Sequence, residues 1–120
     1  MQELFNEVFG VGISEGGLHC LLNKLAKKAL PLYQFIKDSI RTSPVAGADE
    51  TGAKVNGKKH WIWTWQTPQL TYIAASQNRG YQTIESEFES GLPQTILVHD
   101  CWKAHFKTPA TATKYAWHTC

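Results

Sequence analysis

The sequence has few cysteines, no long apolar run and no leader-like start. Its 120 residues include three cysteines, Cys20, Cys101 and Cys120, whose odd number and wide spacing do not match the disulfide framework of a small secreted domain. No apolar run approaches the roughly 18 residues of a membrane-spanning helix. The first residues lack the basic start and apolar core of a signal peptide. These absences predict a cytoplasmic protein without a membrane partner.

The sequence also has little net charge. The formal net charge is +2, and residues 1–43 and 44–78 each carry +1 while residues 79–120 are neutral. No segment is therefore a basic arm, and a role in nucleic-acid binding must rest on particular residues. The hydrophobic content of 42% is typical of an ordinary globular domain, and the chain is long enough to form a real core.

Residues 1–43 have the pattern of helices. One helix face is predicted by leucines at the i, i+3, i+4, i+7 spacing, namely Leu18, Leu21, Leu22 and Leu25. Ser14 is a plausible N-cap, and Pro31 is expected to end this helix or to open the next. Residues 12–25 also have a faint likeness to the second half of a helix-turn-helix. A helical arm over residues 1–43 is the preferred interpretation.

Residues 44–120 have the pattern of a sheet with a helix inserted. Asn56-Gly57 is a strong hairpin signal. Extended segments are predicted at 45–49, 53–55, 60–65, 70–75, 95–99 and 114–118, with a helix at 79–90 and a helical turn at 102–106. The segments between residues 45 and 75 should form a three-stranded antiparallel meander. The order predicts an α+β or α/β fold with a β-β-β-α-β sheet.

Two aspartates stand at the ends of predicted strands. Asp49 ends the first strand and Asp100 follows the fourth. In a β-β-β-α-β sheet these strands can be neighbours, so that the two carboxylates would converge at one edge. Paired carboxylates on strand ends suit Mg²⁺, and two such ions about 4 Å apart stabilise the attacking and leaving oxygens of a phosphoryl displacement. The alternative is an ordinary turn or helix-cap role for each aspartate.

Several further segments surround these aspartates. They are Gly47-Ala48-Asp49-Glu50-Thr51-Gly52, Val55-Asn56-Gly57-Lys58-Lys59-His60-Trp61-Ile62-Trp63, Thr71-Tyr72, Arg79-Gly80 and Val98-His99-Asp100-Cys101-Trp102. In this order they resemble the catalytic core of the insertion sequence 66 (IS66) family of transposases. His118-Thr119-Cys120 resembles the start of that family's next His/Cys-containing segment, and residues 4–16 and 31–33 resemble its preceding helical region. The resemblance covers nearly the whole chain.

The resemblance implies a ribonuclease-H-like mixed sheet and a catalytic triad of two aspartates and one glutamate. Carried over by position, Asp49 would bridge two metal ions and Asp100 would hold one of them. The ions would be Mg²⁺ or Mn²⁺, two in the full-length active form, and would serve to cut and join DNA phosphodiester bonds. The implied partners are DNA, as element ends and target, and other copies of the chain. The implied location is the bacterial cytoplasm, at the nucleoid.

The third acid of the triad is expected beyond Cys120. Residues 44–120 would then be a catalytic core truncated before the helix that carries this acid, and the chain alone is expected to be inactive. Glu85, on the predicted helix with Glu87 and Glu89, is the alternative third ligand, although a solvated acidic face is the preferred interpretation. Glu50 is expected to be structural or to support a metal ligand without touching the metal, because strand alternation points it away from Asp49.

Other residue types leave alternatives open. His99-x-Cys101 and His118-x-Cys120 lack the pair spacing of a closed zinc site. Trp61, Trp63 and Trp65 share one strand face, where core packing is preferred over base stacking. Lys54, Lys58 and Lys59 flank the Asn-Gly turn and would either reach DNA phosphates or serve as soluble edge residues.

Two functions compete with that of a transposase fragment. One is a non-catalytic DNA-binding or dimerisation module, left from a decayed element and using the helical arm and the lysine hairpin. The other is a stand-alone ribonuclease-H-like nuclease, which would require Glu85 to lie within metal-ligand reach of Asp49.

Overall fold

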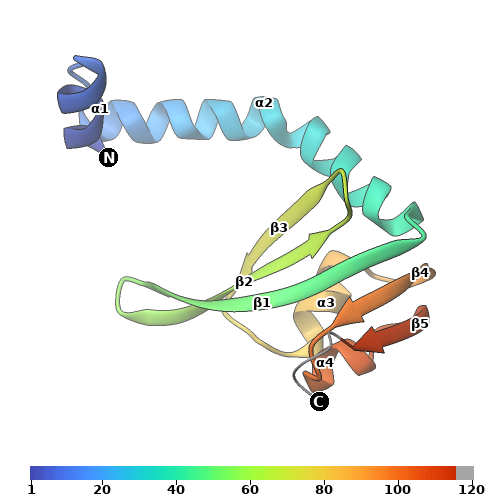
Figure 1. Cartoon of the computed structure of the whole chain (residues 1–120). Helices are drawn as coiled ribbons and strands as arrows, with labels where there is room; N and C mark the ends of the chain where they lie inside the picture. Colours follow the sequence, from blue (N-terminus) through green and yellow to red (C-terminus); the bar gives the residue numbers. More distant parts are fainter. Residues whose placement is uncertain (116–120) are drawn as a thin grey trace. The chain divides into compact units, whose positions relative to one another are not determined.

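The structure is a computed structural model that describes residues 1–115. Its helices are α1 (Gln2–Phe9), α2 (Glu15–Thr42), α3 (Tyr81–Glu87) and α4 (Lys103–Phe106), and its strands are β1 (Val45–Val55), β2 (Lys58–Gln66), β3 (Thr71–Ser76), β4 (Leu92–His99) and β5 (Ala110–Tyr115) (Figure 1). The chain divides into two compact units, Met1–Gln34 and Phe35–Cys120. The predicted α+β class, with N-terminal helices followed by a mixed sheet, is confirmed.

The first unit is helical, as predicted. The Oγ of Ser14 accepts a hydrogen bond of 3.0 Å from the backbone N–H of Gly17, which is the expected N-cap of α2. The break predicted at Pro31 is wrong, because α2 continues through this residue to Thr42. Proline removes one intrahelical hydrogen bond, and the surrounding helix tolerates this loss. Leucines of this helix are exposed, among them Leu21 and Leu25, and dimerisation through the arm stays a prediction.

The second unit contains a five-stranded sheet in the order β3-β2-β1-β4-β5. β1, β2 and β3 pair antiparallel, whereas β4 runs parallel to both β1 and β5. The predicted meander and the predicted neighbourhood of the first and fourth strands are therefore confirmed. The segments 45–49 and 53–55 form one long strand, β1, which turns into β2 at Asn56 and Gly57, both with positive φ.

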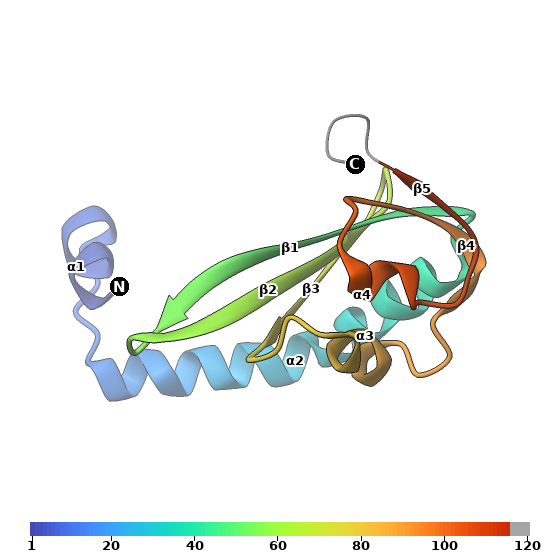
Figure 2. The ribbon, with the colours of Figure 1, turned by 90° about the horizontal axis from the view of Figure 1, so that it is seen from below.

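The core of this unit lies on one face of the sheet. Trp63 and Trp65 are buried, and the ring of Trp65 meets that of Phe88 at 5.0 Å between centroids. Figure 2 shows α3 and α4 on the same face of the sheet. The core role predicted for the tryptophans is confirmed for these two, whereas Trp61 is half-buried. α3 is shorter than the predicted helix 79–90, because the backbone of Phe88 (φ −130°, ψ 85°) leaves the helical region.

Gly91 occupies a position that disfavours any larger residue. Its φ is +66°, and a Cβ there would lie 2.6 Å from Cδ and 2.8 Å from the carbonyl oxygen of Pro109. Gly91→Ala should lower the free energy of unfolding by more than the roughly 1–2 kcal/mol of left-handed strain, as measured by urea denaturation. Gly57→Ala is the control, since Gly57 has φ +76° and open space around it. Equal losses in both variants would show that the contact with Pro109 costs nothing.

Within residues 1–115, no helix is both long enough and apolar enough to cross a membrane. This agrees with the absence of a long apolar run in the sequence.

Candidate metal centre

Asp49 and Asp100 lie where the parallel pairing of β1 with β4 ends. Asp100 directly follows β4, whereas Asp49 lies in the middle of β1, so the prediction that Asp49 ends a strand is wrong. The last pair in the β1–β4 register is Ala48 with His99, so the two aspartates follow it at the next position of each chain segment. Both line one pocket, together with Gly47, Gln66 and Val98. The structure thus places both aspartates that the sequence singled out along one pocket.

The backbone around each aspartate fixes one of its carboxylate oxygens. Oδ1 of Asp49 accepts a hydrogen bond of 2.9 Å from the backbone N–H of Glu50. Oδ1 of Asp100 accepts one of 3.2 Å from the backbone N–H of Trp102. Asp49 is exposed and Asp100 is half-buried. Both carboxylates are therefore held by local hydrogen bonds while remaining accessible from the pocket.

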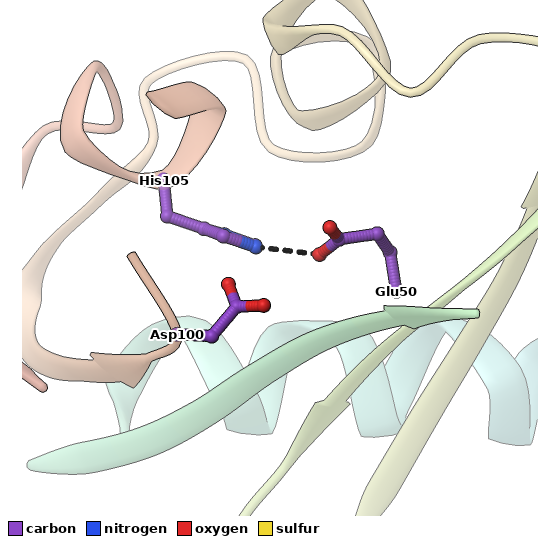
Figure 3. Close-up of side chains that lie close together, drawn as sticks. All are labelled: Glu50, Asp100 and His105. Atoms are coloured by element: carbon purple, nitrogen blue, oxygen red, sulfur yellow. Dashed lines mark hydrogen bonds and ion pairs between the residues drawn. The ribbon is translucent and has the colours of Figure 1, made fainter. Parts of the chain in front are cut away.

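Glu50 lies on the face opposite to Asp49 and forms a buried charge network. One carboxylate oxygen, Oε1, accepts hydrogen bonds from Nε and Nη2 of Arg79 at 3.0 and 2.8 Å. The other, Oε2, lies 2.9 Å from Nε2 of His105 (Figure 3). The side chains of Glu50 and His105 have no exposed surface, whereas that of Arg79 is 35% exposed. A buried carboxylate needs such partners, because burial without them is costly.

The strand alternation predicted the direction of Glu50 but not its partners. Ala46, Ala48 and Glu50 are buried on one face of β1, and Asp49 is exposed on the other, so the prediction that Glu50 points away from Asp49 is confirmed. Arg79 and His105 were missed as site residues. The sequence signal that could have pointed to them is Glu50 itself, since a carboxylate at a buried strand position requires a cationic or hydrogen-bond donor partner.

His99 and His105 pack α4 against the end of β4. Their rings lie 5.1 Å apart, and the ring of Phe106 meets that of His99 at 5.0 Å. Nδ1 of His99 contacts the carbonyl oxygen of Asp100. Nδ1 of His105 is buried and finds no hydrogen-bond partner within the part of the chain that is described. These contacts fix the backbone on which Asp100 stands.

Asp100 belongs to one cluster of possible metal ligands and also lines the pocket of Asp49. Glu50, Asp100 and His105 each offer a ligand atom, and these atoms lie within 4.8 Å of one another (Figure 3). In the cluster of Glu50, Asp100 and His105, the Arg79 guanidinium already neutralises Glu50. This guanidinium would repel a metal cation. Asp49 and Asp100 offer only carboxylate oxygens, which are the ligands that Mg²⁺ and Mn²⁺ prefer. The donor chemistry of the aspartate pair thus fits the expected metal better.

The glutamates of the predicted helix lie elsewhere. Glu85 is exposed and lines a different pocket, together with Arg79 and Trp102. Glu87 accepts a hydrogen bond of 2.5 Å from the hydroxyl of Tyr72 and pairs with Lys37 at 3.4 Å. Neither lines the pocket of Asp49 and Asp100. The structure therefore does not bring Glu85 to the aspartate pair, as the stand-alone nuclease would require.

The remaining candidates are placed as follows. Lys54, Lys58 and Lys59 are exposed along the β1–β2 hairpin. His118 and Cys120, considered for zinc, lie outside the described residues.

A known protein family matches the whole chain. The model of the transposase IS66 family matches residues 1–120, the whole chain. No curated protein matches the sequence. Because the family model matches the full length of the chain, the chain belongs to the IS66 family of transposases.

Proposed function

We propose that residues 44–120 belong to a ribonuclease-H-like core of a transposase that cuts and joins DNA phosphodiester bonds with divalent metal ions. The observation that carries this proposal is the shared pocket of Asp49 and Asp100 where the parallel pairing of β1 with β4 ends. Family membership supports a transposase-related role. The antiparallel β1–β2–β3 meander beside the parallel β4 and β5 supports the fold.

Asp49 and Asp100 are the residues that would hold Mg²⁺ or Mn²⁺. Their carboxylates are hard oxygen donors on separate strands, and the hydrogen bonds from Glu50 N–H and Trp102 N–H limit their rotation. Bound divalent ions would stabilise the attacking and leaving oxygens of a phosphoryl displacement. The contribution of this chain is to fix two ligands before the metal arrives.

DNA is the proposed partner, and the β1–β2 hairpin is one surface that would meet it. Lys54, Lys58 and Lys59 lie in adjacent register positions, with Lys54 opposite Lys59. Exposed lysines that reach phosphates add affinity that falls as the salt concentration rises.

Binding of Mn²⁺ to the chain tests the metal centre. Asp49→Asn and Asp100→Asn keep the size of each side chain but remove its charge, and each should weaken Mn²⁺ binding by about 10- to 100-fold or more. Electron paramagnetic resonance of free Mn²⁺ during a titration measures this loss. Glu85→Gln is the matched control and should leave the affinity unchanged, since Glu85 lines another pocket.

Strand cleavage and transfer provide the second readout. Any Mn²⁺-dependent cutting of DNA by a protein that contains this chain should disappear in Asp49→Asn. Unchanged Mn²⁺ affinity in both aspartate variants, or cutting that survives the loss of Asp49, would overturn the proposal.

A further inference from the structure

A stack of alternating cationic and aromatic side chains links the β1–β2 hairpin to the segment before α4. Nζ of Lys59 lies 4.5 Å from the ring centroid of Trp61. Cζ of Arg79 lies 4.5 Å from the same centroid and 3.8 Å from that of Trp102. Cations over aromatic faces attract the rings electrostatically. Four side chains from three parts of the sequence are thereby held in one arrangement.

Arg79 is fixed at the centre of this stack. Its guanidinium donates two hydrogen bonds to Glu50, and its carbonyl oxygen accepts one of 3.1 Å from Nε1 of Trp102. The two tryptophans beside it are half-buried, so part of each ring surface reaches solvent. The stack is therefore a rigid surface rather than a part of the core.

Next to this surface lies a pocket with an excess of positive charge. It lies between α3 and α4 and has a volume of about 370 Å³. Its charged and aromatic lining consists of Arg79, Tyr81, Glu85, Trp102, Lys103 and Lys107. Glu85 is the one acid in this lining, whereas Glu50 already pairs with Arg79. Lys103 and Lys107 thus face a single exposed carboxylate.

The spacing of these two lysines is unfavourable without an anion. Lys103 is the first residue of α4 and Lys107 is the C-cap that follows the helix, and both are exposed. Both ammonium groups line the same pocket, and their like charges repel each other. An anion in the pocket would remove this repulsion and would contact both ammonium groups.

We propose that this pocket binds a single strand of DNA, with phosphates on Lys103 and Lys107 and a base against the ring of Trp102. Cationic grooves lined with aromatic rings are the usual surface for single strands, since every base has a face that stacks. The choice of DNA rests on the proposed function. The backbone N–H of Trp102 also donates to Asp100, so a strand held here would lie beside a proposed metal ligand.

Fluorescence anisotropy of a labelled 20-nucleotide single strand, titrated with the full chain in EDTA, tests this pocket. Lys103→Ala/Lys107→Ala should weaken binding several-fold and should reduce the slope of log K against log salt by about 1.4, since each phosphate contact contributes about 0.7. Lys24→Ala/Lys28→Ala is the matched control. It also removes two exposed lysines that are four positions apart, so it removes the same amount of positive charge.

The outcomes separate this pocket from the metal centre. Equal losses in the two double variants would mean that only net charge matters and would overturn the pocket. Binding that is unchanged in Lys103→Ala/Lys107→Ala would overturn it as well. The DNA titration is carried out in EDTA, without a divalent metal, so failure of the metal proposal leaves the DNA test intact. Both double variants change exposed side chains, and circular dichroism confirms that each is folded.

Discussion

Trp65→Ala should lower the free energy of unfolding by about 3–5 kcal/mol, the range for large aromatic side chains removed from a core. The side chain is 1% exposed, and its ring lies 5.0 Å from that of Phe88 and 5.9 Å from those of Tyr72 and Trp63. Its removal would leave a cavity among three aromatic rings. Urea denaturation followed by far-ultraviolet circular dichroism measures the loss.

The neighbouring strand offers a control for the Trp65 variant. Ile73 lies on β3 and is 53% exposed, so Ile73→Ala should cost less than about 1 kcal/mol. Trp65→Phe keeps an aromatic ring and should cost less than Trp65→Ala, which provides a measurable value even where the alanine variant fails to fold. A loss of about 1 kcal/mol or less in Trp65→Ala would show that the buried tryptophans of β2 are not the core.

The sequence was informative about this core because its signals are local. Alternation along residues 60–65 places the tryptophans on one face, and Asn56-Gly57 fixes the turn that brings β1 and β2 together. It was harder to predict that residues 45–55 form a single strand, β1. Gly52 interrupts the apolar pattern of that strand, yet pairing with β2 continues to Val55 opposite Lys58. Pairing across a strand is a tertiary effect that local pattern underestimates.

The candidate site likewise contains features that the local sequence predicts and features that depend on tertiary packing. Asp49 and Asp100 could be predicted to lie near each other, because β1 and β4 are adjacent parallel strands and the two aspartates follow the last pair of their register. The partners of Glu50 could not, since Arg79 and His105 lie 29 and 55 positions away in sequence. Nothing in the local sequence around Arg79 or His105 indicates that both residues pair with one buried carboxylate. Such networks become visible only when the packing of α4 on the sheet is known.

Glu50→Ala should also lower the free energy of unfolding by about 3–5 kcal/mol, because it removes one member of a buried charge network and leaves the others unpaired. Nε2 of His105, which is fully buried, would lose its partner at 2.9 Å. Arg79 would lose both hydrogen bonds, although its partial exposure lets water replace some of them. Urea denaturation gives the size of the effect. Glu89→Ala removes an exposed acid of the same type and should change stability by less than about 0.5 kcal/mol.

Double variants show which partner accounts for the cost of losing Glu50. If stranded polar groups cause the loss, Glu50→Ala/His105→Ala should be less destabilising than the two single losses added together, with a coupling of about 0.5–3 kcal/mol. The coupling with Arg79→Ala should be smaller, since the exposed guanidinium can be hydrated. Additive losses in both pairs would show that Glu50 acts through packing alone. The backbone N–H of Glu50 still donates to Asp49 in every variant, so Mn²⁺ affinity should persist wherever the fold does.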